Sequence, residues 1–195
     1  MRIGKVERKT AETDISLQLN LDGSGTADID TGVGFLNHML TLFARHSRFD
    51  LSVNCVGDTD VDDHHSVEDI GIALGTAFSQ AIGDKRGITR YGDIILPMDE
   101  ALVMMAVDIS GRCCLCYDLP LPAQKVGTFD TELAEEFFNA FCRAAAVTLH
   151  VQRLRGTNTH HIIEAAFKAF GRVLRKAAAI DISAADEVPS TKGVL

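Results

Sequence analysis

Apolar and polar residues alternate strictly from Ile15 to Leu21, which is the period of a strand with one buried face. Residues 22–25 are Asp, Gly, Ser and Gly, which are typical of a turn, so a short strand over 27–30 completes a predicted hairpin. Between Phe35 and Phe43 the apolar residues recur at helical spacing. The rest of this half is predicted as a strand over 51–56, a polar loop rich in aspartate over 57–63 and a second helix over 64–82.

The second half of the chain repeats this order. Its predicted strands cover 94–96, 101–109, 113–119 and 148–153, with helices over 132–146 and 160–178 and a loop rich in Pro and Gly over 120–127. The spacing agrees closely, because Leu51 precedes His64 by 13 positions and Thr148 precedes His160 by 12. We therefore predict an internally duplicated α+β fold, in which each half is a β-sheet layer packed on two helices. Residues 1–195 are expected to form one domain. It is made of two repeats, at about 1–92 and 93–182, and a C-terminal tail at 183–195.

The composition is that of an ordinary folded protein, with 46% hydrophobic and 24% charged residues. A formal net charge of −8 argues against a nucleic-acid-binding protein, although the segment 168–176 is locally basic and could meet a small anionic ligand. The longest apolar run, 101–107, is far too short to cross a bilayer. We therefore expect neither a nucleic-acid partner nor a membrane partner.

The cysteines indicate a reducing environment. There are five, an odd number, and the first ten residues lack the apolar core of a secretory signal. A cytoplasmic protein is therefore expected. Cys113, Cys114 and Cys116 lie close together, but the second cysteine pair of a zinc site is missing, so we interpret them as strand residues.

Two histidine doublets carry the strongest chemical signal. His64-His65 and His160-His161 each open a predicted helix, and a glutamate follows three residues later, at Glu68 and Glu164. On a helix, the first histidine and the glutamate are four residues apart and share one face, whereas the second histidine points about 100° away. Each doublet can therefore serve two metal ions, one through its His–Glu pair and the other through the neighbouring histidine. Mixed imidazole and carboxylate ligands suit Mn, Fe, Zn or Ni.

A single doublet of this kind is weak evidence, because solvated or capping histidines are common at helix starts and short motifs match by chance. Two copies at equivalent positions of a duplicated chain favour metal binding. Each half also offers a candidate ligand on its preceding helix, His38 or Glu136, although a solvated helix face explains Glu136 equally well. His46 shares the face of His38. His150, at the centre of a predicted strand, is interpreted as a structural or core-edge histidine.

Four basic residues are candidates for holding a phosphate group, namely Arg90, Arg112, Lys168 and Lys192. Lys168 follows Glu164 by about one helical turn. In the tail, Ser190 and Thr191 stand next to Lys192, and their hydroxyl and ammonium donors can close over an anion. A mobile terminus is the alternative interpretation of this segment.

Long motifs resemble the imidazoleglycerol-phosphate dehydratase family over nearly the whole chain. They are 35–40 (FLNHML) with His46, 63–69 (DHHSVED), 156–165 (GTNTHHIIEA) with 167–170 (FKAF), and 189–193 (PSTKG). The resemblance implies a duplicated α+β fold of the ribosomal protein S5 domain 2-like type. It also implies a homo-oligomer that grows from trimers to a 24-mer, with active sites between subunits and two Mn²⁺ ions in each site.

The resemblance implies two sets of metal ligands. One ion is held by His38, His65, His160 and Glu164. The other is held by His64, Glu68, His161 and the residue at position 136, which is a histidine in some members and Glu136 here. The small phosphate-bearing substrate is contacted by Glu12, His38, His46, Arg90, Arg112, Lys168, Ser190, Thr191 and Lys192.

Such an enzyme is a hydro-lyase that converts D-erythro-imidazole glycerol phosphate to imidazole acetol phosphate in L-histidine biosynthesis. The departing C–H proton is not beside a carbonyl, so we expect a metal-stabilised imidazolate to expel the hydroxyl before a base removes the proton. Glu12 is the candidate base, and His65 and Glu164 complete the expected catalytic set. The alternatives are a two-metal phosphohydrolase, which releases inorganic phosphate, and a non-catalytic protein that stores metal, senses it or assembles through it.

Overall fold

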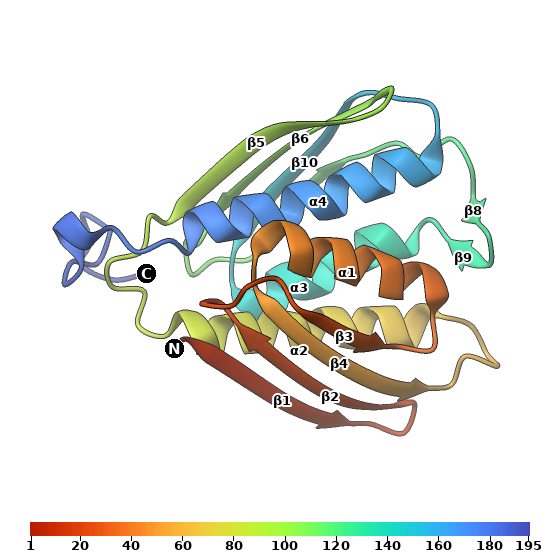
Figure 1. Ribbon diagram of the computed structural model, residues 1–195, viewed down its shortest axis with the longest axis horizontal. Coiled ribbons are helices and arrows are strands. Elements are labelled where there is room, and N and C mark those ends of the chain that lie inside the picture. Colours follow the sequence, from red (N-terminus) through yellow and green to blue (C-terminus); the bar gives the residue numbers. More distant parts are fainter.

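The computed structural model describes all residues, 1–195, and contains two similar halves (Figure 1). The first half has the element order β1 (Ile3–Lys9), β2 (Thr13–Asn20), β3 (Ala27–Asp30), α1 (Gly34–Ser47), β4 (Asp50–Gly57) and α2 (His64–Ile82). The second half has the order β5 (Tyr91–Met98), β6 (Ala101–Asp108), β7 (Cys114–Asp118), β8 (Lys125–Val126), β9 (Phe129–Asp130), α3 (Leu133–Ala145), β10 (Thr148–Arg155) and α4 (Thr159–Ala177). A short 3₁₀ helix, η1 (Ile182–Ala184), begins the C-terminal tail.

The two large sheets have the same topology. Their strand orders are β1-β2-β4-β3 and β5-β6-β10-β7. In each sheet the last two strands run parallel, and the other neighbours run antiparallel. This equivalence confirms the predicted α+β class and the duplicated unit. The β8–β9 hairpin is an insertion that the first half lacks.

The helices lie between the two sheets (Figure 1). Helix α2 packs on β1 and β2, and α4 packs on β5 and β6. The halves meet through their helices, because α1 packs against α4 and α2 packs against α3. The first turns of α2 and α4 lie at the same end of the molecule (Figure 1). None of the helices is both long enough and apolar enough to span a bilayer.

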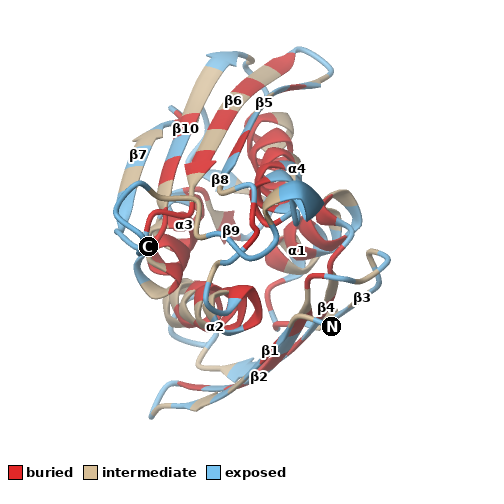
Figure 2. Ribbon diagram, turned by 90° about the vertical axis from the view of Figure 1, so that its left-hand side faces the viewer, coloured by how far each residue is buried: buried red, intermediate tan, exposed pale blue.

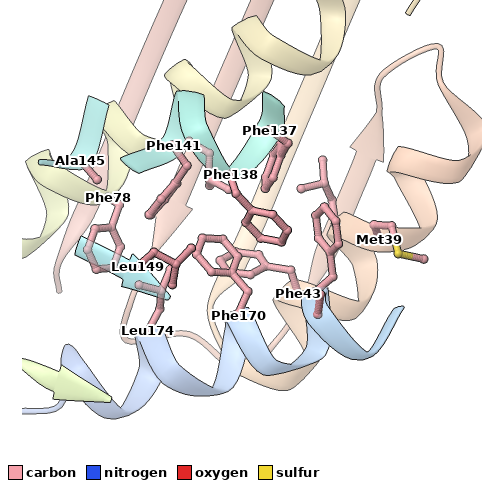
Figure 3. Close-up of a cluster of buried hydrophobic side chains, with 14 of the residues drawn as sticks. Met39, Phe43, Phe78, Phe137, Phe138, Phe141, Ala145, Leu149, Phe170 and Leu174 are labelled. Atoms are coloured by element: carbon pink, nitrogen blue, oxygen red, sulfur yellow. The ribbon is translucent and has the colours of Figure 1, made fainter. Parts of the chain in front are cut away.

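One hydrophobic core of 52 residues extends through both halves. Buried residues line the inner faces of the sheets and the sides of the helices that face one another (Figure 2). At the centre, phenylalanine rings from all four α-helices pack together (Figure 3). Phe170 of α4 lies 4.8 Å from Phe141 of α3 and 5.3 Å from Phe43 of α1, measured between ring centroids. These aromatic contacts hold the helices of one half against those of the other.

Equivalent glycines allow each sheet to approach its helix closely. A Cβ atom on Gly4 of β1 would lie 1.9 Å from the carbonyl oxygen of Ala77, and one on Gly92 of β5 would lie 2.1 Å from that of Val173. No other residue type fits such contacts with a helix backbone. These glycines set the height of α2 and α4 above their sheets, and so help to place the histidine doublets.

The predicted hairpin of 15–21 with 27–30 is wrong, because β3 pairs in parallel with β4 and does not pair with β2. Strand β1 and the β8–β9 hairpin are elements that the sequence pattern does not predict. In β1 only Gly4 is buried, so the strand lacks an apolar alternation. It forms because seven residues pair with β2 at the edge of the sheet. The predicted loop over 120–127 is wrong at its end, where β8 pairs with β9. Pairing with a neighbouring strand, not local pattern, makes both elements.

Candidate metal centre and phosphate pocket

Both histidine doublets lie in the first turn of a helix, as predicted. His64 is the first residue of α2, and its amide donates a hydrogen bond to Asp62. Asn158 is the N-cap of α4, and its side chain accepts a hydrogen bond from the amide of His161. These acceptors satisfy helix amides that have no backbone partner. They fix where each helix starts and thus where the imidazoles leave it.

Three potential metal ligands converge between α1 and α4, and we call them the α1/α4 cluster: His38, His160 and Glu164. Their donor atoms lie within 4.8 Å of one another. The Oε2 atom of Glu164 is 3.1 Å from His160 Nε2 and 3.5 Å from His38 Nε2. The carboxylate is nearly buried, whereas both imidazoles are partly exposed. Two imidazole nitrogens and a carboxylate oxygen form a donor set that suits Mn, Fe, Ni or Zn.

Lys168 contacts the second carboxylate oxygen of Glu164, the one that does not face the two histidines. Its Nζ atom lies 2.6 Å from Oε1 of Glu164. Burial by itself raises the pKa of Glu164, but the charge and hydrogen bond of Lys168, together with the two histidines, outweigh it, and the pKa is lowered. Glu164 is therefore kept ionised, as a metal ligand must be.

The equivalent region of the first doublet is less complete. His64 Nε2 lies 4.0 Å from Glu68 Oε2, and Arg143 of α3 lies 3.9 Å from the other oxygen of Glu68. Glu136 is half-buried on α3, the helix that packs against α2. It makes no ion pair, so the structure does not join it to His64 and Glu68.

The second histidine of each doublet points away from these groups. His65 places Nδ1 3.0 Å from Asp58 and Nε2 3.7 Å from Glu12. His161 places Nδ1 2.7 Å from Glu100. Hydrogen bonds to the carboxylates raise the pKa of both imidazoles. Neither His65 nor His161 joins the α1/α4 cluster within one chain.

The predicted phosphate ligands of the tail gather around one cavity, which we call the tail pocket. It has a volume of about 380 Å³, and its lining includes Arg90, Arg112, Ser190, Thr191 and Lys192. Arg90 is held by Asp108 at 2.7 Å, which raises the pKa of the guanidinium, and by the carbonyl oxygen of Pro189 at 2.8 Å. Three cationic side chains and two hydroxyls around a cavity are suited to a phosphate group.

The remaining predicted substrate contacts lie outside the tail pocket. Glu12 lies between β1 and β2, and Lys168 contacts the α1/α4 cluster. His46 is near the end of α1. Burial is the largest cause that lowers the pKa of its imidazole, and the charges of Lys168 and Arg172 lower it further. Figure 1 shows the C-terminal tail at the end of the molecule opposite the first turns of α2 and α4. One chain therefore does not bring the tail pocket and the doublets together.

Sequence reasoning did not identify Asp58 and Glu100, the carboxylates that bind Nδ1 of His65 and His161. A signal for Glu100 exists in the duplication, because Glu12 directly precedes β2 and Glu100 directly precedes the equivalent strand β6. His150, expected to be structural, is instead exposed on β10.

Comparison with known proteins gives one consistent result. The family model described as imidazoleglycerol-phosphate dehydratase (IGPD) matches residues 31–174. The imidazoleglycerol-phosphate dehydratase of Jannaschia sp. (strain CCS1) is 58% identical over 195 residues, which are 100% of both chains. The enzyme of the same name from Caldanaerobacter subterraneus subsp. tengcongensis is also 58% identical, with 100% of both chains covered.

Solved structures agree with this match. The crystal structure of imidazoleglycerol-phosphate dehydratase from Staphylococcus aureus subsp. aureus N315 has a TM-score of 0.84 and 46% identity, covering 92% of this chain and 99% of that one. IGPD from Pyrococcus furiosus, in complex with (S)-C348, has a TM-score of 0.85 and 38% identity, covering 97% of this chain and 100% of that one. The similarity therefore includes both halves of the fold.

Proposed function

The chain belongs to the imidazoleglycerol-phosphate dehydratase family, and we propose that it dehydrates its substrate with divalent metal ions bound by the two histidine doublets. Members of this family are hydro-lyases of histidine biosynthesis. The substrate is D-erythro-imidazole glycerol phosphate, and the product is imidazole acetol phosphate. The observation that carries the metal proposal is the convergence of His38, His160 and Glu164 within 4.8 Å.

The two histidine doublets would hold two Mn²⁺ ions in each active site, since mixed imidazole and carboxylate ligands are among those that suit this metal. The α1/α4 cluster would hold one ion together with His65. The other would be held by His64, Glu68 and His161, with Glu136 as the fourth ligand. His65 and His161 point away from these groups in their own chain, so a neighbouring copy would supply them. Sites shared between copies require a homo-oligomer, and we propose trimers that assemble into a 24-mer.

The tail pocket would bind the phosphate group of the substrate. Arg90, Arg112 and Lys192 supply positive charge to the pocket. The C-terminal tail that lines it lies at the end of the molecule opposite the first turns of α2 and α4 (Figure 1). An active site between subunits can combine the tail pocket of one copy with the metal ligands of another. Lys168 and His46 would contact the substrate between these two regions.

The chemistry requires help, because the C–H proton that departs is not next to a carbonyl group. When bound, the metal ions would supply Lewis-acid stabilisation to an imidazole ring that has lost its N–H proton. The C–O bond to the carbon attached to the ring would then break, and the hydroxide would leave as water after taking up the proton released by the ring. Glu12 would accept the neighbouring C–H proton, and the resulting enol becomes the ketone. The carboxylate of Glu12 is half-exposed and 3.7 Å from His65, so it is free to reach a substrate atom.

A cytoplasmic location fits the chemistry of the cysteines. All five are free thiols, of which Cys113, Cys114 and Cys116 are exposed. A reducing compartment keeps such exposed thiols unpaired.

The proposal predicts metal-dependent formation of the ketone. Purified protein is stripped of metal, given imidazole glycerol phosphate with and without Mn²⁺, and assayed for ketone and inorganic phosphate together. Ketone is expected only with Mn²⁺, and no phosphate is expected. His160→Ala should lower ketone formation by more than about 100-fold, since it removes a ligand directly. His150→Ala, which removes an exposed histidine of β10, is the matched control and should leave the rate unchanged.

Three results would contradict this function. Release of phosphate without ketone would indicate the two-metal phosphohydrolase. Stoichiometric binding of Mn²⁺ without any product would indicate a non-catalytic metal-binding protein. Full activity of the metal-stripped protein would remove the metal from the mechanism.

A further inference from the structure

The duplication places Glu12 and Glu100 at equivalent positions, each directly before the second strand of its sheet. Each also lies beside the second histidine of a doublet, because Glu12 contacts His65 and Glu100 contacts His161. The two contacts differ in kind. Glu12 approaches Nε2 at 3.7 Å, whereas Glu100 binds Nδ1 at 2.7 Å. The same position therefore has a different role in each half.

Glu100 is fixed by three hydrogen bonds. Its Oε1 atom accepts from the amides of Asn158 at 2.8 Å and Thr157 at 3.3 Å, in the loop that leads into α4. Its Oε2 atom binds Nδ1 of His161. An ionised carboxylate only accepts hydrogen bonds, so Nδ1 of a neutral imidazole must be the donor. The proton then sits on Nδ1, and the lone pair is on Nε2.

We infer that Glu100 is a positioning residue, which fixes the tautomer and the orientation of His161 so that Nε2 is available to a metal ion. A carboxylate behind a ligating histidine fixes the ring and increases the basicity of the free nitrogen. The inference rests on the proposed function, because it takes His161 to be a metal ligand. Glu100 itself is not one of the proposed metal ligands.

The first half supports this inference, because a different carboxylate binds Nδ1 of its second histidine. There, Asp58 binds Nδ1 of His65 at 3.0 Å. Each second histidine thus has a carboxylate hydrogen-bonded to Nδ1, whereas the carboxylates nearest to Nε2 lie 3.7 and 3.8 Å away, beyond hydrogen-bond distance. Because Asp58 supplies that carboxylate, Glu12 is left without a hydrogen bond to its side chain and can act on substrate. In the second half Glu100 orients His161 and is tied to the backbone, so it cannot also serve as a base.

Glu100→Gln tests the inference while preserving shape. The backbone amides of Thr157 and Asn158 need an acceptor, so the amide oxygen of the glutamine takes the place of Oε1. Its NH₂ group then faces Nδ1 of His161, which must become an acceptor, and the proton moves to Nε2. A nitrogen that carries a proton cannot bind a metal. We expect the affinity for one of the two Mn²⁺ ions to fall about 10- to 100-fold.

The experiment measures binding of Mn²⁺ to the metal-stripped full chain. Binding is monitored through the electron paramagnetic resonance signal of free Mn²⁺. Asp99→Asn is the matched control, since it removes the same charge from the neighbouring residue, which is exposed and 3.8 Å from Nε2. Its effect should stay below about fivefold, as for an exposed ion pair. Equal losses in Asp99→Asn and Glu100→Gln would overturn the inference in favour of a general charge effect.

A double-mutant cycle separates positioning from a structural role. If Glu100 acts through His161, adding Glu100→Gln to His161→Ala should change Mn²⁺ affinity no further. A lower thermal midpoint of the metal-free Glu100→Gln protein, with unchanged Mn²⁺ affinity, would show a structural role only and overturn the inference. Normal Mn²⁺ binding by His161→Ala would contradict the ligand set of the proposed function. Weak binding by His161→Ala with normal binding by Glu100→Gln would overturn this inference alone.

Discussion

At the scale of single residues, Glu12 is the side chain on which the proposed proton transfer depends. Its carboxylate is half-exposed and lies beside His65. Glu12→Gln keeps the size and removes the base, so turnover should fall by about 100-fold or more while Mn²⁺ binding is unchanged. Glu7→Gln, on the neighbouring strand β1, is the control, because a glutamine can still accept the hydrogen bond from Ser16. Near-normal turnover of Glu12→Gln would exclude Glu12 as the base.

Asp50 provides a prediction about pH. Its carboxylate accepts hydrogen bonds from the amides of Thr26, Ser24 and Gly25, which lower its pKa below the usual 3.8. A folded-state pKa below the unfolded one stabilises the protein above pH 3.8, and this contribution is lost as the pH falls through the folded-state pKa. The free energy of unfolding of the parent protein should therefore exceed that of Asp50→Asn at neutral pH. The difference between the two free energies should become smaller in acid.

Denaturant unfolding of the parent protein and of Asp50→Asn over a pH series measures this gap. The substitution keeps an acceptor oxygen but removes the charge, so the difference isolates the ionised form of Asp50. A gap that stays constant into acid would show that the turn at 22–26 does not depend on that charge.

At the scale of elements, two equivalent glycines set the distance between the helices of the two halves. A Cβ on Gly75 of α2 would lie 2.6 Å from the carbonyl oxygen of Phe141, and one on Gly171 of α4 would lie 2.7 Å from that of Phe43. Alanine is the better helix former by about 1 kcal/mol. The clash with a helix backbone costs about 1–3 kcal/mol and should outweigh that gain.

Gly75→Ala and Gly171→Ala are therefore expected to lower the thermal unfolding midpoint. Gly34→Ala is the control, since nothing lies within 4 Å of a Cβ at this first residue of α1. It should leave the midpoint unchanged or raise it, because alanine reduces the freedom of the unfolded chain. If both core variants were as stable as the control, the close helix contacts would not matter to the fold.

At the scale of the whole molecule, the C-terminal tail that lines the tail pocket lies at the end opposite the first turn of α4, which carries His160 of the α1/α4 cluster (Figure 1). The proposed sharing of active sites between copies makes a specific prediction for mixed oligomers. His160→Ala lacks a proposed metal ligand and Arg112→Ala lacks a proposed phosphate ligand, so each should be inactive alone. When the two variants are co-expressed in equal amounts, roughly a quarter of the sites should take both intact residues from different copies.

The measurement is the dehydratase rate of the mixed oligomer relative to parent protein at the same concentration. Mixing the two purified variants without dissociation is the control, because subunits that do not exchange form no hybrid sites. A co-expressed mixture as inactive as the separate variants would show that one chain supplies both residues to each site.

The sequence by itself determined the features that depend on neighbours along the chain. The alternation in β2, the helical period of α1 and the spacing of the doublets are local, so they predicted the elements and the duplication. The four-residue spacing also placed His160 and Glu164 on one face of α4. Sequence motifs were sufficient to indicate the family, because they span nearly the whole chain.

Only the tertiary structure decided which distant residues meet. The contact of His38 with Glu164 depends on the packing of α1 against α4, and Glu100 reaches His161 because β6 begins beside the loop before α4. Strand β1 likewise exists because β2 pairs with it. Such contacts are set by the way buried surfaces fit together, and a pattern along the chain does not contain that information.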